Sequence, residues 1–237
     1  MTRRRWIADE VSGTRAVLLG AHAEHLARVL RARVGQEFDI TSGDKVRRGQ
    51  ITSITAERVE FELGAEIAAS VSVQVTLVLS IFKFDRMEWA IEKCTELGVA
   101  RIVPAIARRT EAHLAAAAGK RVERWRRMAL QAAEQSRRAS PPEISQPLKL
   151  KDAAGLSAVL RILLSESETE VMLSDVLRGH STDGEVILGV GPEGGWTEEE
   201  SRLFQDAGWI SASLGNTILR AETAAIAAMA IVQSELS

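Results

Sequence analysis

The chain has 237 residues, of which 46% are hydrophobic and 26% are charged, and its formal net charge is −2. This composition is ordinary for a globular protein and allows either one large domain or a small and a medium one. The sequence has no apolar run long enough to span a membrane and no signal-peptide pattern, and its single cysteine excludes an intramolecular disulfide framework. We therefore expect a cytoplasmic protein without a metal site.

The small net charge conceals an uneven distribution along the chain. Residues 101–138 carry ten Lys/Arg and three Asp/Glu, a local charge of +7, whereas residues 139–237 carry six and fifteen, a local charge of −9. An acidic protein with one concentrated basic segment can still bind a polyanion through that segment. The basic segment is therefore a candidate nucleic-acid contact.

Residues 1–70 have the pattern of a small β-rich domain. A helical spacing of apolar residues over 21–33 is followed by strand patterns over 37–41, 46–55 and 59–63, with turn residues between them. Short strands joined by tight turns are typical of a compact β-barrel. The β pattern fades after residue 64, and the domain boundary is expected there.

Residues 73–237 alternate between buried-type strands and helices. Strand patterns are expected over 73–82, 99–107 and 159–164, followed by strands near Val186 and before Gly215, and helices over 85–97, 120–138, 170–177, 197 onward and 222 onward. Such alternation is typical of an α/β domain with a parallel sheet.

Helix starts are predicted from capping patterns in this second region. Asp85 and Glu88, and likewise Thr197 and Glu200, have the spacing of an N-cap residue and its capping-box partner. Cys94 falls on the apolar face of the first of these helices, where we expect a core residue.

The first of two glycine-rich turns spans residues 187–195 and contains G-x-G-x-x-G at Gly189, Gly191 and Gly194, a dinucleotide-binding fingerprint. The helix expected next begins with three consecutive glutamates, residues 198–200, whose charges would repel a pyrophosphate. No Lys-Ser/Thr pair follows the glycines, which excludes a P-loop. The turn therefore favours a neutral or cationic ligand.

The second turn, residues 213–224, completes a pair of motifs. The sequences are G-P-E-G-G at 191–195 and L-G-x-x-I-L-R-x-E-T-A at 214–224, and the match continues upstream with E-L-G-V at 96–99 and A-E-Q at 133–135. Together these segments resemble the small-subunit (16S) ribosomal RNA uracil-N3 methyltransferases, the RsmE family of the SPOUT superfamily.

The resemblance implies a fold and a set of partners. It implies a PUA-like RNA-binding β-barrel domain over residues 1–70, followed by a trefoil-knotted SPOUT methyltransferase domain over 73–237. It further implies S-adenosylmethionine as cofactor, small-subunit ribosomal RNA as substrate and a homodimer.

Candidate site residues follow from the resemblance for the cofactor, and from charge and position in the sequence for catalysis and RNA contact. Those expected to hold the cofactor are Leu164, Ser165, Gly191, Pro192, Glu193, Gly194, Ser213, Leu214, Gly215, Ile218 and Leu219. Arg220 is expected to stabilise the anionic base, and Glu222 to orient Arg220 or accept the proton. Those expected to contact RNA are Arg3, Arg4, Arg5, Arg28, Arg31, Arg108, Arg109, Arg126, Arg127 and Arg138. Thr217 departs from the family pattern, which has Arg there in many members.

Two alternatives stay open from the sequence. One is a SPOUT methyltransferase that acts on a different RNA, and the other is a non-catalytic RNA-binding protein with the same fold. Arg220 and both intact glycine turns favour an enzyme, because a pure binding protein need not retain them.

Overall fold

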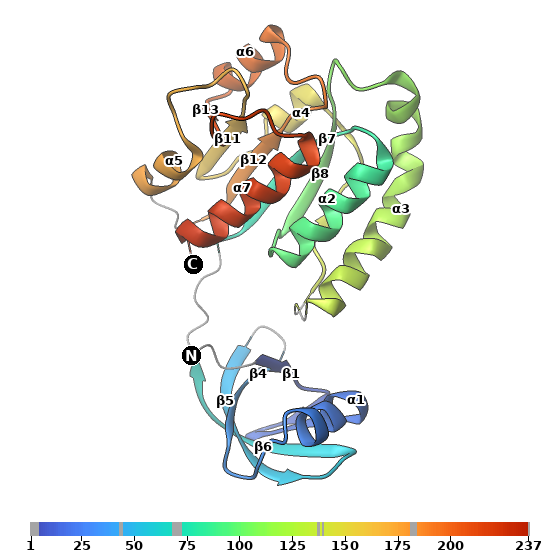
Figure 1. Ribbon diagram of the computed structural model, residues 1–237, viewed down its shortest axis with the longest axis vertical. Helices are drawn as coiled ribbons and strands as arrows, with labels where there is room; N and C mark the ends of the chain where they lie inside the picture. The colour runs from blue at the N-terminus through green and yellow to red at the C-terminus, as the bar shows by residue number, and fades with distance from the viewer. Residues whose placement is uncertain are drawn as a thin grey trace. The chain divides into compact units, whose positions relative to one another are not determined.

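The computed structural model describes residues 5–42, 45–67, 73–136, 138, 140–180 and 184–236. The chain divides into two compact units, Met1–Val71 and Ser72–Ser237, each with its own core. The two units are drawn in Figure 1.

The N-terminal unit is a curved six-stranded sheet with one short helical segment (Figure 1). Its elements are β1 (Arg5–Ile7), β2 (Glu10–Ser12), β3 (Arg15–Leu19), α1 (Gly20–Glu24), the π-helical turn η1 (His25–Val29), β4 (Glu37–Ser42), β5 (Lys45–Ile54) and β6 (Arg58–Ile67). The strand order is β1-β4-β5-β6-β3-β2, and the pairings are antiparallel except for β1 with β4. Leu18, Leu26 and Phe61 are fully buried between the sheet and the helical segment.

The helical segment is shorter than the predicted span of 21–33. It ends near Leu30, and Arg31 has a φ of 49°, in the left-handed region that interrupts a right-handed helix. Apolar spacing alone does not reveal such a residue, because arginine is a good helix former.

The second unit is a seven-stranded parallel sheet with helices on both faces. Its strands are β7 (Val75–Ser80), β8 (Arg101–Ile106), β9 (Glu143–Ile144), β10 (Leu148–Lys149), β11 (Leu160–Leu164), β12 (Val186–Val190) and β13 (Ile210–Ala212), and its helices are α2 (Phe84–Glu96), α3 (Ala112–Gln135), α4 (Leu150–Ala154), α5 (Leu173–Gly179), α6 (Glu198–Asp206) and α7 (Ala221–Leu236). The main strand order is β10-β8-β7-β12-β11-β13, β9 pairs with β8, and every pairing is parallel. The predicted α/β class with a parallel sheet is confirmed.

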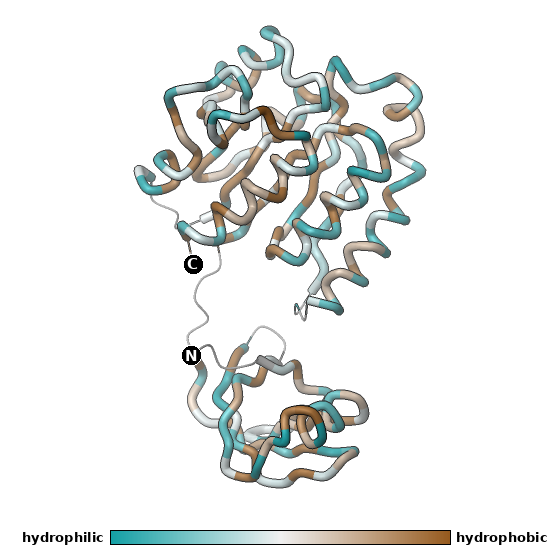
Figure 2. The backbone as a smooth tube through the Cα atoms, in the orientation of Figure 1, coloured by the Kyte–Doolittle hydropathy of each residue, from teal (hydrophilic) through white to brown (hydrophobic). Residues whose placement is uncertain are grey.

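Alternation along the strands divides the core into two layers. Leu77 and Leu79 of β7 point to the layer that α2, α3, α5 and α7 cover, whereas Val78 points to the layer beneath α4 and α6. Because both faces are covered, the central strands β7 and β12 are buried along their whole length and are largely apolar, as the hydrophobic stretches of Figure 2 show. The continuous apolar runs in the sequence have this physical cause.

Two predicted helix starts differ from the structure. α2 begins at Phe84 with Lys83 as N-cap and no side-chain cap, so the prediction that Asp85 caps this helix is wrong. The Glu88 carboxylate instead receives two hydrogen bonds from Arg124 of α3, at 2.7 and 2.9 Å. A charge-assisted pair to a neighbouring helix outweighs a local cap.

α3 begins at Ala112, eight positions before the predicted start at residue 120. Gly119 lies inside the helix. Because a glycine inside a helix lowers its stability by about 1 kcal/mol relative to alanine, Gly119 looks in the sequence like a helix boundary. Leu114 and Ala118 are buried by this first part of the helix, and their burial offsets the cost. The strands β9 and β10, at two residues each, are too short to be predicted from periodicity.

Two other predictions are confirmed. Thr197 accepts a hydrogen bond from the Glu200 backbone while the Glu200 carboxylate receives the Thr197 N–H, which completes a capping box. Cys94 is buried in the core, and burial raises the pKa of its thiol to about 12.

Candidate functional site

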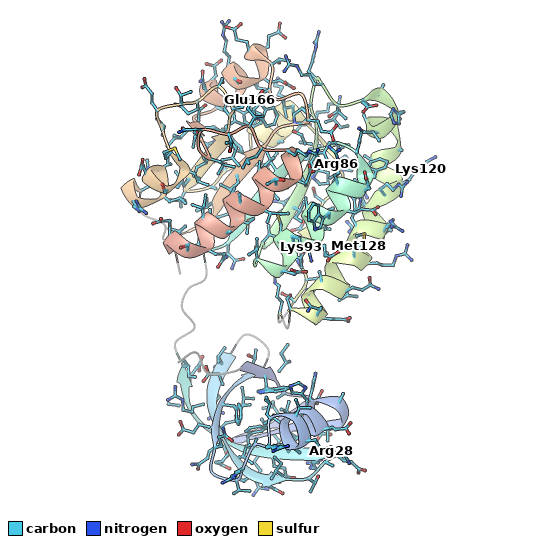
Figure 3. All side chains as sticks on the ribbon, in the orientation of Figure 1. Arg28, Arg86, Lys93, Lys120, Met128 and Glu166 are labelled. Atoms are coloured by element: carbon cyan, nitrogen blue, oxygen red, sulfur yellow. The ribbon has the colours of Figure 1, made fainter. Side chains whose placement is uncertain are left out.

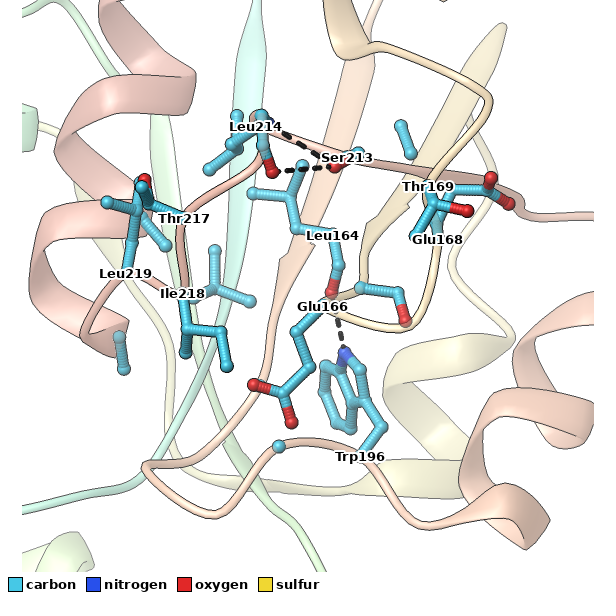
Figure 4. A pocket seen from close by; sticks show the side chains of 18 of the residues that line it. Leu164, Glu166, Glu168, Thr169, Trp196, Ser213, Leu214, Thr217, Ile218 and Leu219 are labelled. Carbon is cyan, nitrogen blue, oxygen red and sulfur yellow. Dashed lines mark hydrogen bonds between the residues drawn. The ribbon is translucent and has the colours of Figure 1, made fainter.

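A pocket lies where the carboxyl ends of β11, β12 and β13 meet, lined by the loops that follow these strands (Figure 4). The last residues of the three strands, Leu164, Val190 and Ala212, form its floor. Its cavity volume is about 190 Å³, several times the roughly 30 Å³ that one water molecule occupies in the liquid. Open α/β sheets bind ligands at this edge, so the position and size indicate a site for a small organic molecule.

The loop after β12 forms the wall that contains Trp196. The indole Nε1 donates a 2.9 Å hydrogen bond to the carbonyl oxygen of Leu164, drawn as a dashed line in Figure 4. The ring packs on Phe204, which packs on Trp209 with ring centroids 4.8 Å apart. A Cβ atom at Gly191 would lie 3.2 Å from the Trp196 ring, a tight contact that would require the ring to shift. The aromatic column thus anchors the wall in the core.

Gly195 shapes the turn before Trp196. Its φ is 70°, and its N–H donates a 2.8 Å hydrogen bond to the Pro192 carbonyl oxygen. A Cβ at this position would lie 2.5 Å from Oε1 of Glu166. Glycine is therefore favoured by the backbone conformation, and any side chain here would also displace the Glu166 carboxylate.

The loop after β13 forms the opposite wall. The Ser213 N–H donates to the Val171 carbonyl at 2.8 Å, and the Leu173 N–H donates to the Ser213 carbonyl at 3.0 Å, which ties this wall to the loop before α5. Gly215 has a φ of 126°, and its N–H lies 3.3 Å from the Ser213 hydroxyl. Ile218 is 82% exposed at this wall, an unusual exposure for a large apolar side chain.

Carboxylates dominate the electrostatics of the pocket. Glu166, Glu168 and Glu193 line it, and among the described residues no lysine or arginine does so. The backbone N–H groups of Glu170 and Val171 donate to the Glu168 carboxylate and hold its pKa below the usual range, which keeps it ionised. This environment favours a cationic or neutral ligand over a polyphosphate.

The structure brings together all the residues expected to hold a cofactor except Gly194, which packs against the Arg109 side chain instead. Asn216 and Thr217, which lie within the second glycine turn, also line the pocket. Sequence reasoning missed further lining residues, which are Glu166, Glu168, Thr169, Val190, Gly195, Trp196, Ala212, Ala221 and Ala224. A signal existed for some of them, since Glu166 and Gly195 directly follow predicted site residues in the chain.

The two residues expected to carry catalysis occupy different environments. Arg220 is exposed between Leu219 and Ala221, both of which line the pocket. Glu222 is only 2% exposed and lies in the first turn of α7, outside the lining. Its Oε1 is 3.8 Å from Nε of Arg86, and its Oε2 has no hydrogen-bond partner within the part of the chain that the structure describes.

The arginines expected to bind RNA from the N-terminal unit are placed only in part. Arg3 and Arg4 lie outside the described residues, and Arg5 begins β1. Arg28 forms an exposed 2.9 Å ion pair with Glu24, and Arg31 follows η1.

Of the three expected in or after α3, two make contacts within the protein. Arg126 donates to the Ile144 carbonyl oxygen at 3.1 and 2.8 Å, which ties α3 to β9. Arg138 donates to the Thr95 carbonyl at 2.8 Å, and burial lowers the pKa of its guanidinium. Arg127 is exposed. The basic segment therefore mixes structural arginines with accessible ones.

Arg108 and Arg109 lie in the turn after β8, beside the glycine loop. The Arg108 backbone N–H donates a 2.6 Å hydrogen bond to the Glu200 carboxylate, while its side chain is exposed. The Arg109 guanidinium donates to the Gly194 carbonyl oxygen and lies 3.5 Å from the Trp196 carbonyl oxygen. Arg109 is thus engaged with the pocket wall.

Comparison with known proteins matches both units. Residues 69–233 match the family described as RNA methyltransferase domain, and residues 18–64 match the RNA methyltransferase PUA domain. A fold of a small PUA-like domain followed by an α/β domain with this pocket defines an RNA methyltransferase of two domains. In the described part of the chain no helix could cross a membrane, and no group of three or more His, Cys, Asp or Glu is arranged to hold a metal ion.

Curated relatives identify the family. The chain is 30% identical to ribosomal RNA small subunit methyltransferase E of a Synechocystis strain, over 96% of this chain and 76% of the relative. It is 35% identical to the protein of the same name from Mycobacterium bovis, over 93% of this chain and 87% of that one. The chain belongs to the ribosomal RNA small subunit methyltransferase E family.

Two solved structures of similar proteins contain a bound cofactor. One is a ribosomal RNA small subunit methyltransferase E from Neisseria gonorrhoeae bound to S-adenosylmethionine, with a TM-score of 0.66, 29% identity and 98% of each chain covered. The other is a putative methyltransferase from Legionella pneumophila in complex with S-adenosylmethionine, with a TM-score of 0.65, 28% identity and 99% of this chain and 98% of that one covered.

Proposed function

We propose that this protein uses S-adenosylmethionine to methylate N3 of a uridine in 16S ribosomal RNA. The observation that carries the proposal is the acidic pocket at the ends of β11, β12 and β13. Relatives that resemble the chain over nearly its whole length have been crystallised with this cofactor. The family name supports ribosomal RNA as the substrate.

The residues of the pocket fit the cofactor. It has a positively charged sulfonium and ammonium group, which the carboxylates of Glu166, Glu168 and Glu193 that line the pocket would attract. Gly191 and Gly195 leave the wall free of side chains where a Cβ would approach the Trp196 ring to 3.2 Å and Oε1 of Glu166 to 2.5 Å. When bound, the cofactor supplies an activated methyl group whose leaving group is a neutral thioether.

The chain must make uracil N3 nucleophilic, because this nitrogen carries a proton at neutral pH. Arg220 is exposed beside the pocket and would stabilise negative charge on the uracil carbonyl oxygens as the proton leaves. Glu222 is buried next to Arg86, which supports a role in positioning neighbouring groups more than direct proton transfer. Thr217 lines the same wall, so the departure from Arg there alters the mouth of the pocket.

Homodimerisation through the second unit is part of the proposal. Ala227 and Ala230 of α7 keep exposed area, and small residues allow close approach of a second backbone. Sedimentation at micromolar concentration tests this point, and a monomer under those conditions would contradict it.

The trefoil knot that the family resemblance implies also belongs to the proposal. The hydrogen bonds from Ser213 to Val171 and from Leu173 to Ser213 support a C-terminal segment held by an earlier loop. Tracing residues 160–236 in an experimental density map, followed by closure of the chain ends, would decide whether the path is knotted.

One experiment tests the reaction. Small-subunit ribosomal RNA, free and in assembly intermediates, is incubated with the protein and labelled S-adenosylmethionine, and the product is mapped by nuclease digestion and mass spectrometry. We expect one N3-methyluridine. Label at another position or only in transfer RNA would support a different SPOUT specificity, and cofactor and RNA binding without methylation would indicate a non-catalytic protein.

A further inference from the structure

Arg86 connects the two walls of the pocket from outside it. It lies in the first turn of α2, and Figure 3 labels it at the end of α2 that lies beside α7. Its Nη1 donates a 2.6 Å hydrogen bond to Oε1 of Glu193 in the first wall. Its Nε lies 3.8 Å from Oε1 of the buried Glu222, which begins the helix after the second wall. One guanidinium thus pairs with both segments.

A second arginine holds the same loop at the next residue. The guanidinium of Arg109 donates to the Gly194 carbonyl oxygen, and its Cδ would lie 3.1 Å from a Cβ at Gly194. The loop over 193–196 is therefore held by Arg86 at its first residue and by Arg109 at the next. Neither arginine lines the pocket.

The charges explain why Arg86 is held firmly in place. A carboxylate as buried as Glu222 is costly unless a cation compensates it, and Arg86 is the cation that the structure places beside it. Lys83, 4.0 Å from Oε2 of Glu193, adds positive charge on the solvent side of the loop. The Arg86 guanidinium is therefore held by the buried Glu222 carboxylate, and it in turn holds the exposed Glu193.

From this geometry we infer that Arg86 and Arg109 are positioning residues, which clamp the loop over 193–196 in the conformation that receives the cofactor. The inference rests on the proposed function for the identity of the ligand. It assigns Arg109 to the loop instead of to an RNA phosphate. It also assigns Glu222 the task of anchoring Arg86.

Hydrogen exchange without any ligand tests the clamp. In Arg86→Met, which keeps most of the apolar stem, we expect the Gly195 amide, which donates to the Pro192 carbonyl oxygen, to exchange about tenfold faster, because the hydrogen bond that holds Glu193 is lost. Arg86→Lys should give an intermediate rate, because an ammonium lacks the planar fork. Arg109→Met should also accelerate exchange of the Gly195 amide. The control is Arg202→Met, whose side chain pairs with exposed Glu198 on α6 and should leave the loop unchanged.

Ligand affinity supplies the second measurement. We expect the dissociation constant for S-adenosylhomocysteine to rise about 10-fold or more in Arg86→Met and to stay within twofold of wild type in Arg202→Met. Loop exchange in Arg86→Met within twofold of wild type would overturn the clamp. If Arg86→Met does not fold, Glu193→Gln removes the loop side of the pair alone, and unchanged exchange in that variant is equally decisive. Failure of the wild-type protein to bind either S-adenosyl compound would instead overturn the proposed function.

Discussion

The indole N–H of Trp196 is bonded to the carbonyl oxygen of Leu164 at 2.9 Å, and this bond joins two strand-end loops that are 32 positions apart in the chain. Leu164 ends β11, whereas Trp196 belongs to the loop after β12. The bond fixes the ring as a wall of the pocket, and the ring packs closely against Gly191, where a Cβ would lie 3.2 Å from it. A single side chain thus couples the form of the glycine loop to the sheet.

Trp196→Phe keeps an aromatic ring and removes the N–H. The Leu164 carbonyl then loses its side-chain donor, and we expect a loss of about 1 kcal/mol in the free energy of unfolding and weaker binding of S-adenosylhomocysteine. Urea unfolding and titration calorimetry measure the two effects. Trp89→Phe is the control, since Trp89 is 52% exposed on α2 and its replacement should change neither. Equal effects of the two substitutions would contradict the role of the indole bond.

Gly195→Ala introduces a Cβ where φ is 70° and where the Glu166 carboxylate would have to move away. We expect a cost of about 1–2 kcal/mol in unfolding free energy and a marked loss of cofactor binding. Gly119→Ala should instead stabilise α3 by about 0.5–1 kcal/mol, because this helical glycine is exposed and a Cβ there meets only the Gln146 side chain, at 3.9 Å. Thermal unfolding of the two variants should shift in opposite directions.

Cys94 makes the stability of the protein depend on alkaline pH. Burial raises the pKa of its thiol to about 12, whereas an unfolded cysteine titrates near about 8.5. The unfolded state therefore loses the proton first, so the stabilisation is fully present below about pH 8.5 and decreases above it by up to about 1.4 kcal/mol per pH unit. Urea unfolding from pH 7 to 10.5 measures the slope. Cys94→Ala should remove this component, and an unchanged alkaline slope in that variant would refute the assignment.

Arg220→Ala should act mainly on the turnover rate. If Arg220 stabilises charge that appears only as N3 loses its proton, the loss in single-turnover rate at saturating RNA is expected to be about 10²-fold or more, by analogy with removal of one oxyanion donor. Arg220→Lys should restore only part of the rate, because an ammonium cannot present two donors in a plane. A wild-type rate in Arg220→Ala would make this residue a binding or structural one.

The two adjacent arginines of α3 should separate RNA binding from stability. Arg127→Ala removes an exposed charge and should lower the salt dependence of RNA affinity by about one unit of slope with no change in unfolding. Arg126→Ala removes the donor to the Ile144 carbonyl and should lower the unfolding free energy by about 1–3 kcal/mol. Filter binding at several salt concentrations, paired with urea unfolding, distinguishes the two. Equal changes in RNA affinity and in unfolding free energy for the two variants would contradict the assignment of Arg127 to RNA and of Arg126 to the protein interior.

The sequence by itself determined the parallel α/β class, because strands covered on both faces must be apolar throughout and those runs alternate with helical spacing. It also determined the start of α6, since Thr197 and Glu200 form their capping box across only three positions. The two glycine turns indicated the site and, with the upstream segments, the family. Each of these features depends on residues that are close together in the chain, so its pattern can be recognised from the sequence.

The tertiary structure alone decided which charged side chains are available. Arg109 donates to Gly194, Arg86 to Glu193, and Arg124 to Glu88, over 85, 107 and 36 positions. The strand order that brings these segments together depends on packing of the whole sheet, which periodicity does not encode. An arginine side chain is chemically the same whether it contacts RNA or a carbonyl oxygen of its own chain. Only its neighbours in the folded protein distinguish an RNA-binding arginine from a structural one.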